Sequence, residues 1–169
     1  MAHEKLIFRA KDRAAIPDRP RSHPWNSKSE MRGSRLGDKV GLKRIGVHHI
    51  TIPPGKESFV FHSHLTEEEF LFVLSGRALI EIEDETYQLE PGDFVGFPAP
   101  SVAHHVRNPF DEPFVYLTGG ERHEVEIADF PRHGRRMVRV GRTIEIYPHS
   151  AQQSLEEAAT DFKAGGRTP

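Results

Sequence analysis

Apolar and polar side chains alternate with a period of two along most of the chain between residues 43 and 119. In residues 69–75, Leu71 and Val73 share one face, and the two phenylalanines beside them share the other. Successive side chains of a β-strand point to opposite faces, so this pattern indicates a strand with one face toward a core. The alternation therefore predicts strands for this part of the chain.

Turn-forming residues separate these short segments, among them Pro53-Pro54-Gly55, Gly76 and Pro91-Gly92-Asp93. The predicted strands cover residues 43–52, 57–62, 69–75, 77–83, 94–98, 103–108 and 113–119. Short strands at regular spacing, with glycine and proline between them, are typical of an all-β sandwich or barrel.

The two ends of the chain differ from this pattern. Residues 11–35 combine several prolines with the single tryptophan, Trp25, and predict an extended arm, because proline keeps its neighbours out of helix. Ser154 and Glu157 fit a capping box and predict a short C-terminal helix. We expect an arm over residues 1–35, a β-barrel over 36–147, and a helix and tail over 148–169.

The composition excludes several classes of protein. The chain has 169 residues, enough for one domain, and its formal net charge of -2 disfavours binding to nucleic acid. There is no apolar run of membrane-spanning length, and the polar N-terminus does not resemble a secretory signal. Cysteine is absent, which removes disulfides and thiolate chemistry. We expect a cytoplasmic protein with no membrane contact.

Paired histidines suggest a metal site. His62 and His64 lie two residues apart, so in a strand their imidazoles face the same side. Two such imidazoles suit a divalent metal ion, and three glutamates follow them. Glu69 shares the inward face of its strand, whereas Glu68 faces the other side and Glu67 falls in a turn. Parity therefore favours Glu69 as the third ligand.

The segment "GDFVGFPAPSVAHHVRN" offers a fourth ligand, because one of its two histidines must point inward. His104 shares a face with Val106, and His105 shares a face with Arg107. Since arginine prefers the surface, His104 is the predicted inward residue and His105 a predicted surface or interface residue.

These segments resemble the two signature motifs of the cupin superfamily. In "HSHLTEEEFLFVLSG" and "PGDFVGFPAPSVAHHVRN", the residues in register with the motifs are His62, His64, Glu69, Gly76, Gly92, Pro98, His104 and Asn108. The resemblance implies a double-stranded β-helix, or jelly-roll barrel. More narrowly, the chain is similar to small bacterial single-domain cupins, some of which carry sugar-phosphate-isomerase-like names.

The residue types and the resemblance together predict one divalent metal ion as cofactor: zinc, iron, manganese or nickel. Its expected ligands are His62, His64, Glu69 and His104. Three imidazoles and one carboxylate leave two positions of an octahedral ion open for substrate or dioxygen. Cupins of this kind include isomerases, lyases and dioxygenases.

We therefore expect a metal-dependent enzyme acting on a small oxygen-rich metabolite, with His48, His49 or Tyr116 moving protons. The alternative is a cupin that binds or senses a sugar or organic acid without turning it over. Fold by itself does not choose between these functions.

We also expect a homodimer. A proline-rich arm has little reason to be ordered on its own. We therefore predict that residues near 5–30 pack against a partner subunit. This contact would bury Trp25 and some of the phenylalanines Phe59, Phe61, Phe70 and Phe72.

Overall fold

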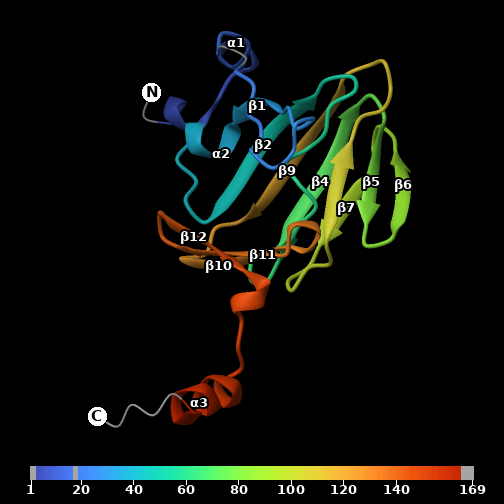
Figure 1. The fold of residues 1–169 in the computed structure, drawn as a ribbon. Helices are drawn as coiled ribbons and strands as arrows, with labels where there is room; N and C mark the ends of the chain where they lie inside the picture. The colour runs from blue at the N-terminus through green and yellow to red at the C-terminus, as the bar shows by residue number, and fades with distance from the viewer. Residues whose placement is uncertain (1–2, 17–18, 165–169) are drawn as a thin grey trace.

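The structure is a computed structural model that describes residues 3–16 and 19–164, with the backbone alone described for residues 161–164. Within these ranges, twelve strands form three antiparallel sheets (Figure 1). The strands are β1 (Arg32–Arg35), β2 (Ile45–Ile52), β3 (Ser63–His64), β4 (Glu69–Ser75), β5 (Ala78–Ile82), β6 (Glu85–Leu89), β7 (Phe94–Phe97), β8 (His104–Arg107), β9 (Phe114–Glu121), β10 (Val125–Phe130), β11 (Arg135–Val140) and β12 (Thr143–Pro148).

The largest sheet has the order β1-β2-β9-β4-β7, the second β12-β11-β10-β3 and the third β6-β5-β8. Neighbouring strands in each sheet are often far apart in sequence, as in a jelly roll. The predicted all-β fold is confirmed. The sheet that contains β1 begins inside the range expected to be an arm.

The chain also forms short helical segments outside the sheets. They are η1 (Glu4–Leu6), α1 (Ala10–Ala14), α2 (Leu36–Lys39), η2 (Pro131–His133), η3 (His149–Ala151) and α3 (Leu155–Ala164). None of the described helices combines the length and the apolar character that crossing a bilayer requires.

The predicted C-terminal helix is present as α3. The backbone N–H of Ser154 donates to Glu157 Oε2 over 2.6 Å, and the N–H of Glu157 donates back to Ser154 Oγ over 3.2 Å. This reciprocal pair satisfies two N–H groups that a helix start otherwise leaves without a partner. Figure 1 shows α3 apart from the sheets, and Leu155 is 87% exposed. The predicted tail beyond residue 164 lies outside the described residues.

The alternating pattern of residues 69–75 positions the core. Leu71 and Val73 are buried among apolar side chains of the facing sheets, while Phe72 on the other face is 38% exposed. Ile80 on β5 belongs to the same core. The period-two pattern therefore identified the inward face of the strands correctly.

Two strand predictions were wrong or incomplete. Residues 57–62 form no regular strand and make only isolated bridges, so His62 lies just before the two-residue β3, which carries His64. The sheet of β10, β11 and β12 was not predicted, although β10 pairs directly with β3, with Ala128 opposite His64. This unpredicted sheet holds the His-x-His segment in place.

The arm lies on its own barrel. Arg21 forms an antiparallel bridge with Met31, with N–H to O distances of 2.8 and 2.9 Å. The Trp25 ring packs edge-on against Phe130, with ring centroids 5.3 Å apart. The barrel of the same chain supplies this contact to the arm, and packing of residues near 5–30 against a partner subunit stays a prediction. Pro17 of the arm lies outside the described residues, and the homodimer stays a prediction.

Candidate metal centre

The four predicted metal ligands come from three separate stretches of chain. His62 immediately precedes β3, His64 ends β3, Glu69 begins β4 and His104 begins β8. The backbones of His62 and His104 form an isolated antiparallel bridge, with N–H to O distances of 3.1 and 2.8 Å. This bridge fixes the spacing of two imidazoles that are 42 residues apart in sequence.

The structure brings these side chains together. Nε2 of His62 lies 3.1 Å from Nε2 of His64. Oε2 of Glu69 lies 3.5 Å from Nε2 of His64 and 3.5 Å from Nε2 of His104. Ligand atoms of His62, Glu69 and His104 all fall within 4.8 Å of one another. Such spacing matches donors placed around one ion at bond lengths of about 2.0–2.2 Å.

The other ring nitrogens of His62 and His104 are fixed by the backbone. Nδ1 of His62 lies 2.8 Å from the carbonyl oxygen of Val60, and Nδ1 of His104 lies 3.1 Å from that of Val102. A carbonyl oxygen can only accept, so each Nδ1 carries the proton and donates. The lone pair of each neutral ring therefore sits on Nε2, which faces the centre.

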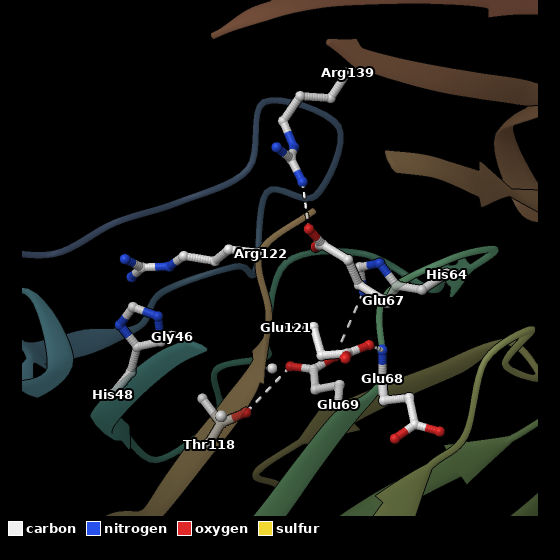
Figure 2. A pocket seen from close by; sticks show the side chains of 12 residues that line it. Gly46, His48, His64, Glu67, Glu68, Glu69, Thr118, Glu121, Arg122 and Arg139 are labelled. Carbon is white, nitrogen blue, oxygen red and sulfur yellow. Dashed lines mark hydrogen bonds and ion pairs between the residues drawn. The ribbon is translucent and has the colours of Figure 1, made fainter. Parts of the chain in front are cut away.

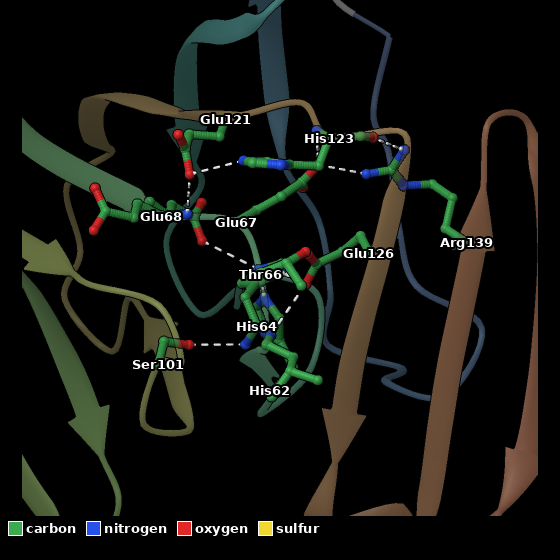
Figure 3. A network of polar contacts seen from close by, with 12 residues as sticks. His62, His64, Thr66, Glu67, Glu68, Ser101, Glu121, His123, Glu126 and Arg139 are labelled. Atoms are coloured by element: carbon green, nitrogen blue, oxygen red, sulfur yellow. Dashed lines mark hydrogen bonds and ion pairs between the residues drawn. The ribbon is translucent and has the colours of Figure 1, made fainter.

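The second ring nitrogen of His64 is fixed by a carboxylate, not by a backbone carbonyl. Glu126 on β10 is 1% exposed, and its Oε1 lies 3.2 Å from His64 Nδ1 and 3.2 Å from the backbone nitrogen of Leu65. The Thr66 hydroxyl donates to the other oxygen (Figure 3). Sequence reasoning missed Glu126. Its parity with Ala128 and Phe130 was the available signal.

The three consecutive glutamates have separate positions. Glu69 points to the histidines, and Thr118 Oγ1 lies 3.1 Å from its Oε1. Glu68 is exposed, and Glu67 pairs instead with the guanidinium of Arg139 at the rim (Figure 3). The parity argument placed these residues as the structure does.

The charges at the centre favour metal binding. Burial, followed by the neighbouring imidazoles, lowers the pKa of His62 to about 3, so this ring is neutral at neutral pH. Burial raises the pKa of Glu69, but hydrogen bonds from His104 and His64 outweigh it, and the net pKa lies well below the usual range. Burial lowers the pKa of His64, but the hydrogen bond and charge of Glu69, and then those of Glu126, outweigh it and raise the pKa. The set therefore offers a neutral imidazole at His62 and one charged carboxylate, and a metal ion would compete with a proton at His64.

The donor set fits the expected ion. Imidazole nitrogen with carboxylate oxygen suits zinc, iron, manganese and nickel. Orientation of each ring by an acceptor on Nδ1 is the arrangement found around bound metals. These residues could hold one divalent ion. The structure does not select which.

The centre opens into a cavity of about 290 Å³ inside the barrel. Its walls combine apolar side chains with a few polar ones, as expected of a small-molecule site. The polar residues, besides the four ligands, are Arg21, His48, Ser58, Tyr116 and Thr118.

A second hollow of about 380 Å³ adjoins this cavity and shares His48, His64, Glu69 and Thr118 with it (Figure 2). Acidic and basic side chains line its outer part, which is open to solvent. We interpret this hollow as the approach from solvent to the centre.

The three candidates for proton transfer differ in position. His48 lines the cavity, and its Nδ1 is buried without a hydrogen-bond partner. His49 lies beside Arg13 in a different surface hollow, so it does not reach the centre. Tyr116 lines the cavity, and burial raises its pKa, so its hydroxyl stays protonated and donates a hydrogen bond, here to Met31 Sδ over 3.6 Å.

The prediction for His105 was wrong. This residue is 6% exposed, and its two ring nitrogens each lie 3.8 Å from a carboxylate, one of Glu57 and one of Glu81. Its side chain does point away from the metal centre, as parity requires. The segment at Glu57 pairs alongside β8 through a bridge to Arg107, and the carboxylates of Glu57 and Glu81 flank the ring. Strand parity tells which way a side chain points, but it does not tell whether a distant segment of the chain buries that side chain.

Comparisons with known proteins agree on one family. The cupin domain matches residues 48–120. A solved structure from Acidithiobacillus ferrooxidans, provisionally named a sugar phosphate isomerase, is 34% identical with a TM-score of 0.86 and covers 90% of this chain and 97% of that chain. A second, from Silicibacter pomeroyi and named a sugar phosphate isomerase from a cupin superfamily, is 25% identical with a TM-score of 0.69 and covers 75% and 82%.

Among curated proteins, an uncharacterized protein of Methanocaldococcus jannaschii is 30% identical over 66 residues, which make up 39% of this chain. The match spans 51% of that protein, so the chain corresponds to about half the length of this relative.

Proposed function

The chain belongs to the cupin superfamily, and on that premise we propose that it is a metal-dependent enzyme acting on a small oxygen-rich metabolite. One observation carries the proposal. Three imidazole Nε2 atoms and the Glu69 carboxylate converge at the wall of a cavity of about 290 Å³, and each ring is oriented by an acceptor on its Nδ1. A purely structural cluster has no need of an adjoining cavity.

The four converging residues would hold the ion. Bound there, a divalent ion supplies Lewis acidity that polarises a carbonyl or hydroxyl oxygen of the substrate. Tyr116 donates a hydrogen bond to a substrate oxygen from the cavity wall. His48 accepts a proton at Nδ1, the atom that has no partner in the barrel. Burial and then the charge of Arg21 lower the pKa of His48, so the ring is neutral and able to accept.

We favour isomerisation of a hydroxy-carbonyl compound. The relatives from Acidithiobacillus and Silicibacter carry sugar phosphate isomerase names, and this reaction needs one group that removes a proton and returns it. His48 takes the proton from the hydroxyl-bearing carbon next to the carbonyl and returns it to the former carbonyl carbon, while the hydroxyl proton passes to the former carbonyl oxygen, so that hydroxyl and carbonyl exchange places. Lyase and dioxygenase chemistry need further groups, and they serve as the competing outcomes of the test.

The test uses protein loaded in turn with zinc, iron, manganese and nickel. Each form is incubated with aldose and ketose phosphates, hydroxy and keto acids, and catechol-like compounds, with and without dioxygen, in deuterated water. Incorporation of deuterium at carbon, followed by NMR, detects proton transfer even where equilibrium hides turnover. We expect activity in the wild type and its loss in His104→Ala.

The matched control is His123→Ala, which removes a half-exposed histidine of the loop between β9 and β10 and should keep full activity. A wild type that binds compounds through its metal but neither exchanges nor converts any of them is a binding or sensing protein. That result would replace the enzyme proposal with the non-catalytic alternative.

A further inference from the structure

The N-terminal arm brings a positive charge to the cavity of the metal centre. Arg21 lines that cavity together with His62 and His104, and its Nη2 is buried without a hydrogen-bond partner among residues 3–16 and 19–164. Among the described residues, no carboxylate forms an ion pair with this guanidinium. The two backbone hydrogen bonds to Met31 hold the residue in place from the arm side.

Other arginines on this side of the barrel are neutralised. Arg122 lies 2.7 Å from Asp38, and Arg35 lies 3.8 Å from the same carboxylate. Arg21 gains no such partner, although burying a guanidinium donor without an acceptor costs free energy. A protein keeps such an arrangement where a ligand completes it, because binding then replaces the missing contacts.

Two further observations connect Arg21 to the metal ligands. Besides burial, the charge of Glu69 raises the pKa of Tyr116 and the charge of Arg21 lowers it, so the Tyr116 hydroxyl lies within electrostatic reach of both. His48 also lines this cavity with an unpartnered Nδ1. The cavity thus has the metal ligands on one part of its wall and, on another, an unsatisfied donor at Arg21 and an unsatisfied ring nitrogen at His48.

We infer that Arg21 binds an anionic group, a carboxylate or a phosphate, of the molecule whose oxygen atoms occupy the metal centre. This inference rests on the proposed function and adds the charge of the substrate to it. The planar guanidinium presents paired donors that match both groups. A cavity of about 290 Å³ limits that molecule to a small metabolite.

The two anion sources can be separated with compounds that share one carbon skeleton. Glycerate carries a carboxylate, glycerol 3-phosphate carries a phosphate, and glycerol is neutral. Binding to the metal-loaded protein is measured by calorimetry, and metal content by elemental analysis. We expect the wild type to bind one of the two anions at least about 10-fold more tightly than glycerol, since a charged hydrogen bond contributes that much.

Arg21→Gln should weaken binding of that anion by about 10- to 100-fold while glycerol binding and metal content stay unchanged. The matched control is Arg35→Gln, which removes a nearby exposed arginine that already has a partner and should keep the preference. If Arg21→Gln does not fold, Arg21→Lys serves instead, since it keeps the cation but loses the paired donors and should bind the anion more weakly than the wild type.

The possible failures are distinguishable. A wild type that holds metal but binds glycerol as tightly as both anions overturns the inference and leaves the proposed function standing. The same conclusion follows if Arg21→Gln keeps the full preference for the anion. A protein that takes up no metal yet shows an Arg21-dependent preference contradicts the proposed function and supports the role of Arg21.

Discussion

Glu126 Oε1 lies 3.2 Å from Nδ1 of His64, and this carboxylate is 1% exposed. It belongs to β10, so the sheet that follows the cupin motifs in sequence orients a ligand inside them. A buried carboxylate that accepts from an imidazole fixes both the ring orientation and the position of its proton. The metal centre therefore depends on a residue outside the two motifs.

We expect Glu126→Gln to weaken metal affinity by about 10- to 100-fold, because the amide keeps the size of the side chain but loses the charge that orients His64. Competition with a chelator of known affinity measures the change. The control is Glu124→Gln, on the exposed loop before β10. Equal metal affinity in wild type and Glu126→Gln would show that the contact only stabilises the fold.

The choice among the three glutamates can be tested by thermal unfolding. A metal present at 100 times its Kd stabilises the folded state by about 2.7 kcal/mol, which corresponds to a rise in Tm of several degrees. We expect wild type and Glu68→Gln to show this rise and Glu69→Gln to lose most of it. If Glu69→Gln kept the rise in Tm and Glu68→Gln lost it, Glu68 would be the metal ligand instead.

Much of the site could be predicted from sequence because strand parity is a local property. Leu71 and Val73 identify the inward face, and Glu69 follows from them two residues earlier. The same rule separated His104 from His105. It could not reveal that both are buried, because the segment at Glu57, which is distant in sequence, pairs alongside β8 and brings its carboxylate to 3.8 Å from the His105 ring.

The sheet of β10 to β12 was missed for a different physical reason. In Val125–Phe130 the apolar residues Val125 and Ile127 suggest one inward face, yet the buried face carries Glu126, Ala128 and Phe130. A glutamate is placed inward because His64 supplies its hydrogen bond. Local pattern cannot show a polar contact between residues 62 positions apart. Nothing local to Arg21 indicates its place in the cavity either.

The proposed role of His48 predicts a specific kinetic defect. His48→Asn should lower kcat by about 10²- to 10⁴-fold, the usual contribution of a positioned acid or base, with metal content unchanged. The comparison is His49→Asn, on the neighbouring residue that faces a different hollow, which should keep its activity. A His48→Asn enzyme with normal kcat would remove His48 from proton transfer.

The sheet beside the metal centre should lose stability in acid. Asp129 on β10 and Arg136 on β11 form two hydrogen bonds of 2.7 Å. The bond to Arg136, and secondarily the one from His149, lowers the pKa of Asp129 although burial opposes it. A lowered folded-state pKa means that the stabilisation is present above the unfolded value near 4 and is lost as the pH falls below it.

We therefore expect Asp129→Asn to unfold a few degrees below the wild type at pH 7, which corresponds to about 1 kcal/mol for a partly exposed pair. The difference should shrink as the pH falls below about 4 and through the lowered pKa of Asp129. Asp84→Asn, at the exposed turn between β5 and β6, should unfold with the wild type throughout. A difference that is constant with pH would show that packing, not charge, is responsible.

Besides the arm, the outer face of the largest sheet offers a contact for the predicted homodimer. Phe70 and Phe94 stack there with ring centroids 5.7 Å apart, Phe94 is 65% exposed, and Phe72 on the same face is 38% exposed. Clustered aromatic side chains in contact with water favour association, because burial removes their apolar surface from solvent. We propose that a second copy of the chain covers this face.

Phe94→Lys tests that contact directly. The side chain is mostly exposed, so the substitution should cost little folding stability, but a charge at the centre of an apolar contact opposes association. Sedimentation at micromolar concentration should give a dimer for the wild type and a monomer for Phe94→Lys. The control Trp25→Ala removes an aromatic residue of the arm and should leave the dimer intact. A monomeric wild type would refute the dimer itself. If the dimer survives Phe94→Lys but not Trp25→Ala, the arm and not the sheet forms the dimer contact.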